Sequence, residues 1–316
     1  CGSWLLEDES TNLVPYSEDF SQWSNVSTTL TSGYLAPDGT LGATKISGTI
    51  GTSNIVLGGS SSTTATRTIY ARTVSGTGTA KLMSFHQNTN NLFTLTEEWQ
   101  RFELNGAIST GGTSSYIDFR DNSQTLSEFI IWGAQSEELT YATSYIPTSG
   151  ASSTRLRDIA TGSGNSTLIN STEGVLYAEI AALADDLTNR EITISPDDGT
   201  NNYVMIRFNN GTSNWIYTRV NVGGNAEYFY INNNNIITDF NKIALRFQDN
   251  NFATFVNGVK IDSQLSGNTF GVGVLNKINF AGGTGSQPFY GKTKALAVYK
   301  EALTDANLRC LTYPPA

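Results

Sequence analysis

The sequence predicts an all-β protein made of two β-sandwich domains in series, with one short C-terminal helix. Short runs rich in β-branched and aromatic residues recur along the 316 residues, separated by Gly, Asn, Ser and Thr. Such spacing is typical of β-sandwiches. Asn-Gly pairs between runs, such as Asn210-Gly211, favour hairpins. The clearest runs are residues 68–73, 81–85, 100–104, 128–132, 204–208, 242–248 and 295–299.

Three local signals define turns and the helix. Asn257-Gly258 predicts a type I′ hairpin turn, because both central residues of that turn need positive φ. The Asn-rich residues 232–235 are expected to form a hairpin loop. Residues 303–311 predict the helix, because Thr304 can cap its start and two leucines share a face.

A change in composition indicates the domain boundary. Residues 148–164 are rich in small polar residues and contain no apolar run of strand length. The predicted boundary lies near Leu156, which gives domains of residues 1–156 and 157–316.

The charge balance limits the classes of partner. Charged residues make up only 15% of the chain, the net charge is −9, and Lys and Arg form no cluster. Nucleic acids and anionic membrane surfaces attract basic proteins, so neither is an expected partner. No apolar run is long enough to span a bilayer. The hydroxyl- and amide-rich composition favours a location on a virion surface or outside or on the surface of a cell.

Three stretches of the first half resemble a known family. They are NLVPYSEDFSQWS from Asn12, TEEWQRFEL from Thr96 and WGAQSEELTYATSYIPTSG from Trp132. Together they resemble the carbohydrate-binding-module-like jelly rolls of tailed-phage fibre proteins.

The second half resembles the concanavalin A-like, laminin G-type sandwiches. The matching pieces are EGVLYAEI from Glu173, FVNGVKI from Phe255 and FYGKTKALAVYKEALTDANL from Phe289. The resemblance implies two jelly-roll sandwiches and recognition of a surface glycan or host receptor. The chain would then be part of a phage tail fibre or a similar adhesive appendage, where a homo-oligomer would add avidity.

Two alternatives to this function remain. The chain could be a structural or assembly module of a virion or extracellular appendage that binds no sugar. It could also be a bacterial surface lipoprotein adhesin, since Cys1-Gly2-Ser3 resembles the start of a lipoprotein after signal cleavage. The second cysteine, Cys310, is expected on the C-terminal helix and unpaired with Cys1.

Catalytic residues are not expected. Retaining glycosidases of the resembled fold carry an E-x-D-x-x-E pattern on one strand, and Glu179 is followed by Ile180-Ala181 instead. The single histidine, His86, lies beside a turn in the first domain and is expected to be a solvated surface residue. The sequence therefore predicts a protein that is not an enzyme.

Structural calcium is the one cofactor that the resemblance suggests. Acidic residues in turn-like contexts are the candidates, although Asp often serves only to form a turn. Because no spaced D-x-D-x-D run is present, the turn interpretation is preferred for each. The weak candidates are Asp197, Asp198, Asp185 and Asp186.

A candidate ligand-binding face follows from alternation in two consecutive β-runs. In residues 203–208 and 215–222, every second residue is apolar and should face the core. The opposite face would then gather aromatic rings and arginines, which are common in binding surfaces. These residues are Trp215, Tyr217, Tyr203, Arg207 and Arg219. The alternative is that this face packs against the first domain or another subunit. Trp132, Trp99 and Trp23 are expected in the core.

Overall fold

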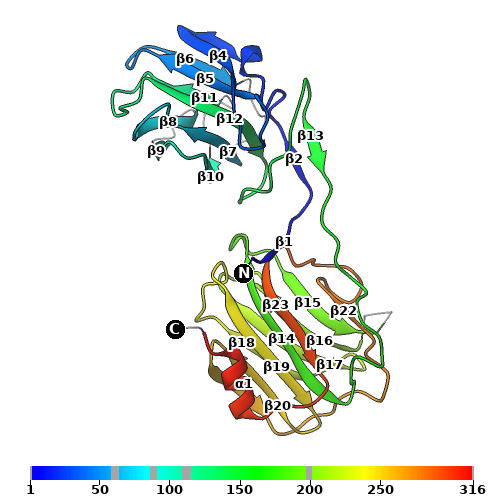
Figure 1. Cartoon of the computed structure of the whole chain (residues 1–316). Coiled ribbons are helices and arrows are strands. Elements are labelled where there is room, and N and C mark those ends of the chain that lie inside the picture. Colours follow the sequence, from blue (N-terminus) through cyan, green and yellow to red (C-terminus); the bar gives the residue numbers. More distant parts are fainter. Residues whose placement is uncertain (1, 58–63, 86–90, 109–114, 197–200, 315–316) are drawn as a thin grey trace. The chain divides into compact units, whose positions relative to one another are not determined.

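The computed structural model describes residues 2–57, 64–85, 91–108, 115–196 and 201–314. Within these ranges the chain is all-β, apart from the 3₁₀ turn η1 (Phe20–Gln22) and one helix, α1 (Asp305–Thr312) (Figure 1). The predicted fold class is confirmed.

The chain divides into two compact units. The first domain is Glu9–Leu156, and the second domain is Arg157–Ala316 together with the N-terminal residues up to Asp8. The predicted first domain began at residue 1. The N-terminal residues belong to the second domain instead, because strand β1 (Trp4–Leu6) pairs antiparallel with β23 (Gly291–Tyr299).

The first domain is a sandwich of two five-stranded antiparallel sheets, ordered β10-β7-β12-β5-β4 and β3-β6-β11-β8-β9, with a separate pair β13-β2. The strands are β2 (Ser10–Asn12), β3 (Ser24–Val26), β4 (Thr28–Tyr34), β5 (Ala43–Gly48), β6 (Asn54–Leu57), β7 (Thr64–Arg72), β8 (Gly78–Phe85), β9 (Leu92–Leu95), β10 (Gln100–Ile108), β11 (Ser115–Asp118), β12 (Glu128–Glu137) and β13 (Ser153–Arg155).

Alternation along β12 shows how the first-domain core forms. Phe129 and Ile131 point between the two sheets, into the main apolar cluster, while Trp132 packs in a second cluster on the other face. Trp23 is also buried, so the core assignment of these two tryptophans is confirmed. Trp99 is only partly buried, against the same second cluster.

The second domain is a sandwich of a six-stranded sheet, β1-β23-β14-β19-β20-β21, and a five-stranded sheet, β18-β17-β16-β15-β22. The remaining strands are β14 (Glu173–Ala182), β15 (Arg190–Ser195), β16 (Tyr203–Phe208), β17 (Ile216–Val222), β18 (Asn225–Asn232), β19 (Asn241–Gln248), β20 (Phe252–Val256), β21 (Val259–Gln264) and β22 (Lys277–Asn279).

Helix α1 covers the outer face of the six-stranded sheet (Figure 1). Its Leu308 is fully buried, in a cluster that includes Phe255 of β20. The Thr304 side chain caps the helix by accepting a hydrogen bond from the Asn307 backbone N–H at 3.3 Å. The helix and its cap are as predicted.

The Asn-Gly turn between β20 and β21 is also as predicted. Asn257 has φ 49° and Gly258 has φ 82°, the left-handed values that a type I′ turn requires. The pairing of β20 with β21 agrees with a two-residue turn, because Val256 lies opposite Val259.

The hairpin predicted at Asn210-Gly211 is confirmed, because β16 and β17 are adjacent antiparallel strands. Its loop has seven residues and is longer than a two-residue turn. Residues 232–235 do not close a hairpin, because β18 and β19 belong to different sheets. There the sequence marks a change of direction, but strand pairing decides which strands it joins.

Candidate ligand-binding site

The outward face of β15 and β16 carries a polar site in the second domain. Ile206 and Phe208 of β16 face the core, as predicted, so Tyr203, Met205 and Arg207 face outward. In the neighbouring strand, alternation places Glu191 and Thr193 on the same outward face. The ladder sets Glu191 directly opposite Arg207.

A cavity of about 290 Å³ opens over these side chains. Its volume is near the lower end of small-molecule pockets, roughly 300–1,000 Å³. One wall is the sheet and the other is the loop between β22 and β23. The lining residues are Glu191, Thr193, Tyr203, Met205, Arg207, Gly282, Gly283, Thr284, Ser286 and Gln287. We call this cavity the β15–β16 pocket.

The loop wall is tied to β15 at both ends. The Thr193 hydroxyl donates to the Ala281 carbonyl at 2.8 Å, and the Glu191 backbone N–H donates to the Gln287 carbonyl at 3.0 Å. Within the loop, the Gly282 N–H donates to the Ser286 carbonyl at 2.6 Å. These bonds fix the loop against the sheet, so the pocket does not depend on a ligand for its shape.

An ion pair forms the charged part of the pocket. Arg207 Nε donates to Glu191 Oε1 at 2.7 Å, and Nη2 contacts the same oxygen. Arg207 Nη1 donates to Asn210 Oδ1 at 3.0 Å. Burial raises the pKa of the Glu191 carboxyl above its ordinary value, although the Arg207 charge acts in the opposite direction.

Aromatic rings and arginines alternate beside the pocket. The Arg207 guanidinium carbon lies 5.2 Å from the Tyr217 ring centroid, and that of Arg219 lies 5.8 Å from the Tyr203 ring centroid. Tyr217 in turn stacks on Phe229 of β18, with 6.2 Å between centroids. Cation–π contacts of this kind stiffen the long arginine side chains.

The five predicted binding residues separate into three groups. Tyr203 and Arg207 line the β15–β16 pocket. Arg219 and Tyr217 face outward beside it, but Tyr217 is only 8% exposed, because the ring of Phe229 and the guanidinium of Arg207 flank it. Trp215 immediately precedes β17 and is half-buried.

The sequence analysis missed Glu191, Thr193 and the loop wall. Residues 190–195, REITIS, alternate in the same way as the two β-runs that were used. That signal could have placed Glu191 on the outward face. It could not have placed Glu191 beside Arg207, because the partner strand and register are not local properties.

The calcium candidates are partly accounted for by protein contacts. Both Asp186 oxygens bind the Arg190 guanidinium, and Asp185 accepts a hydrogen bond from Ser213. Asp197 and Asp198 lie outside the described residues. Among the residues that the structure describes, no group of three or more His, Cys, Asp or Glu side chains is arranged to hold a metal ion.

Other predicted features fall outside the pocket. Cys310 is an exposed free thiol on α1, as expected, whereas Cys1 and His86 lie outside the described residues. Glu179 contacts Lys294 across 3.8 Å. No helix in the described part of the chain is long and apolar enough to cross a membrane.

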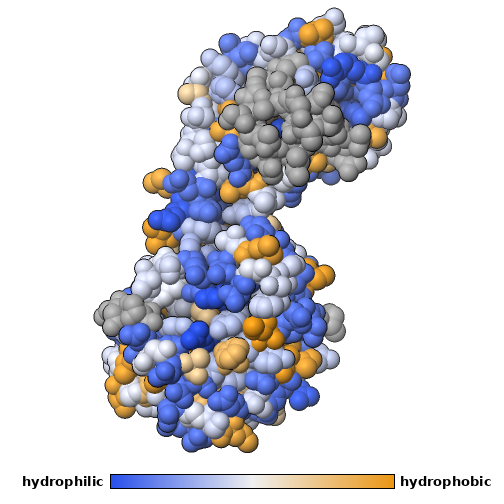
Figure 2. Space-filling model, turned by 180° about the vertical axis from the view of Figure 1, so that it is seen from behind, coloured by the Kyte–Doolittle hydropathy of each residue, from blue (hydrophilic) through white to orange (hydrophobic). Residues whose placement is uncertain are grey.

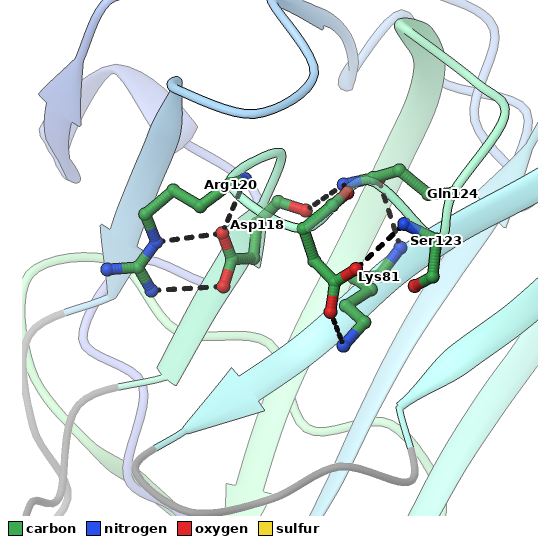
Figure 3. A network of polar contacts seen from close by, with 6 residues as sticks. Lys81, Asp118, Arg120, Ser123 and Gln124 are labelled. Atoms are coloured by element: carbon green, nitrogen blue, oxygen red, sulfur yellow. Dashed lines mark hydrogen bonds and ion pairs between the residues drawn. The ribbon is translucent and has the colours of Figure 1, made fainter.

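The first domain carries a polar network on β8, β11 and the following loop (Figure 3). Lys81 pairs with Asp121 at 2.5 Å, and Arg120 binds Asp118 through two nitrogens at 2.9 and 3.0 Å. Gln124 ties the loop to the strand by donating to the Asp118 carbonyl at 2.6 Å. The network secures a surface loop against the strand.

The surface offers no competing apolar site on the face seen in Figure 2. On the described part of that face, hydrophobic residues are scattered among hydrophilic ones. Scattered apolar side chains are normal on a folded protein and need no partner.

No protein-family model and no curated protein sequence matches the chain. Solved structures show a remote likeness. The Ruminococcus gnavus IT-sialidase CBM40 bound to α2,3-sialyllactose is 17% identical, over 49% of this chain and 95% of that one, with a TM-score of 0.40. The leech intramolecular trans-sialidase is 18% identical, over 50% of this chain and 27% of that one, with a TM-score of 0.40. The SAP-like pentraxin from Limulus polyphemus is 10% identical, over 47% of this chain and 72% of that one, with a TM-score of 0.38.

Proposed function

We propose that the chain binds carbohydrate without cleaving it, and that the β15–β16 pocket is a binding site. The observation that carries this proposal is the content of the pocket. A tyrosine ring, hydroxyl groups, an arginine and a carboxylate converge on one preformed cavity of about 290 Å³. Sugars present both hydroxyl groups and apolar C–H faces, so they need polar groups together with a ring.

The carboxylate count favours binding over hydrolysis. Glycosidases in most families use two carboxyl groups that flank the scissile bond. Glu191 is the one carboxylate among the described residues that line the pocket, and its Oε1 is held by Arg207. A single carboxylate that is already paired with an arginine is suited to accept a hydrogen bond from a ligand.

The biological setting is a further part of the proposal. We infer a location on a virion surface or outside or on the surface of a cell, as part of a phage tail fibre or similar adhesive appendage. The support is the low content of charged residues and the resemblance of both halves to jelly-roll adhesion modules. A homo-oligomer would strengthen such binding through avidity.

A structural module is the second candidate function. Phe229 is 57% exposed on β18, next to Tyr217 on the same outward face. An exposed aromatic beside arginines also suits packing against another protein. This candidate predicts that the face binds a protein subunit and no sugar.

A glycan array probed with the multivalent recombinant chain tests the proposal. We expect binding to a subset of glycans. The array is read with calcium and with a chelator, and equal binding in both would show that calcium has no role. Tyr203→Ala should weaken that binding by about 1–3 kcal/mol, roughly 5- to 150-fold, by analogy with aromatic stacking on bases. The matched control is Trp4→Ala, which removes a 71% exposed ring outside the pocket.

Two results would count against the proposal. Absence of binding to every glycan in the multivalent format would favour the structural module. Equal losses in Tyr203→Ala and Trp4→Ala would show that the pocket is not the site.

A further inference from the structure

The charges inside the β15–β16 pocket cancel. Its lining contains one cation, Arg207, and one anion, Glu191, and the other lining residues are uncharged. The two charged groups are in direct contact and little exposed, at 17% and 7% of their side chains. A ligand that enters the pocket therefore meets an ion pair and not a net charge.

The ion pair leaves hydrogen-bonding capacity on both partners. Two Arg207 nitrogens contact Glu191 Oε1, and none of the described residues donates a hydrogen bond to Oε2. A guanidinium has five N–H groups, so Arg207 keeps further donors after its bonds to Glu191 and Asn210. The pocket thus offers a charged acceptor and a charged donor side by side.

Gly282 lets the loop pack closely against that acceptor. A Cβ at this position would lie 2.7 Å from Glu191 Oε2 and 2.8 Å from Ser286 Oγ. A side chain here would therefore push the carboxylate or the loop out of place, so glycine preserves the position of the acceptor in the pocket wall.

We propose that the pocket selects a neutral, hydroxyl-rich sugar unit, with Arg207 donating to one hydroxyl and Glu191 Oε2 accepting from its neighbour. This inference rests on the function proposed above. Adjacent sugar hydroxyls can accept and donate in turn, which matches the paired groups. An acidic sugar would bring its carboxylate against Glu191, and Arg207 is already neutralised by that residue.

Arg219 provides the contrast on the same face. Its Nη2 donates to Asn221 Oδ1 at 2.7 Å, and it forms no ion pair with a carboxylate of the described residues. It does not line the pocket. An anionic sugar bound to this face would depend on Arg219, whereas a neutral sugar in the pocket would not.

The test compares matched neutral and acidic ligands on the full chain. Glucose- and galactose-terminated oligosaccharides are measured beside their glucuronic and galacturonic counterparts by calorimetry or on multivalent beads. We expect binding of a neutral ligand that persists up to about 0.5 M NaCl, where exposed charges are screened. Glu191→Gln should weaken it by about tenfold or more, the cost of losing a hydrogen bond to a charged group.

Two variants act as controls for this loss. Arg219→Gln should leave neutral-ligand affinity unchanged. Gly282→Ala should weaken binding by displacing the Glu191 carboxylate or the loop, while both charges of the pair are retained. The melting temperature of each variant shows that the second domain is folded, so a loss of binding can be assigned to the pocket.

The neutral-sugar assignment, the role of the ion pair and the proposed function would each be contradicted by a different result. Binding of the acidic set alone, lost in Arg219→Gln and weakened by salt, would overturn the neutral-sugar assignment but leave glycan binding intact. Unchanged neutral-ligand affinity in Glu191→Gln would overturn the role of the ion pair. Absence of binding to both sets would contradict the proposed function itself.

Discussion

Each domain contains an arginine bound to a carboxylate beside a tyrosine ring. In the first domain, Arg120 binds Asp118, and its guanidinium carbon lies 4.8 Å from the Tyr116 ring centroid. In the second domain, Arg207 binds Glu191, with Tyr217 at 5.2 Å. The chemical groups are nearly the same, but their surroundings differ.

Burial and sequence separation distinguish the two pairs. Arg120 is 47% exposed and lies two residues after Asp118, which is 12% exposed, so the pair is local and its cation is solvated (Figure 3). Arg207 is 17% exposed, and its partner lies on another strand under a loop. Desolvation therefore dominates at the second pair, while solvent screens the first. The two ion pairs therefore differ in burial and not in residue type. The more buried pair is the one that lines the β15–β16 pocket.

The largest expected difference is in stability. Arg207→Met should lower the free energy of unfolding by about 3–5 kcal/mol, because Glu191 stays buried without its cation. Arg120→Met should cost only about 0–1 kcal/mol, as is usual for exposed pairs. Differential scanning calorimetry of the full chain measures both. Similar losses in the two variants would mean that the two environments do not differ in the way described.

Glu191 and Asp121 should also respond to pH in opposite directions. Burial raises the pKa of Glu191 above its ordinary 4.5, so its contribution to stability is full below pH 4.5 and is lost as pH rises through the folded-state pKa. The Lys81 ammonium lowers the pKa of Asp121 below its ordinary 3.8. The contribution of Asp121 is therefore present above pH 3.8 and is lost as pH falls through the lower folded-state value.

Carboxyl-carbon NMR titration checks both directions, with Glu191→Gln and Asp121→Asn to assign the signals. We expect a midpoint above 4.5 for Glu191 and below 3.8 for Asp121. A Glu191 midpoint below 4.5 would show that the Arg207 charge outweighs burial, and the distinction between the pairs would then be wrong.

The smallest expected effect is at the exposed end of the first-domain network. Lys81→Met should cost less than about 1 kcal/mol, because its partner Asp121 is 42% exposed. The cost should shrink further in about 0.5 M salt, which screens exposed charges. Denaturation at low and high salt measures it, and a cost that does not change with salt would indicate a desolvated pair.

The sequence by itself determined features that depend on neighbouring residues. The β-runs, the Thr304 cap and the Asn257-Gly258 turn follow from local backbone preferences. The inward faces of β16 and β17 follow from period-two alternation, because successive side chains point to opposite sides of a strand. This is why Tyr203 and Arg207 could be assigned to an outward face before the structure was known.

The tertiary structure alone decided how the outward residues are used. Register brings Glu191 opposite Arg207, and the loop at residues 282–287, between β22 and β23, lies over them. Phe229 covers Tyr217, which alternation had placed on the outward face. Alternation assigns a side chain to a face of its strand, whereas burial and charge pairing depend on which distant segments pack over that face.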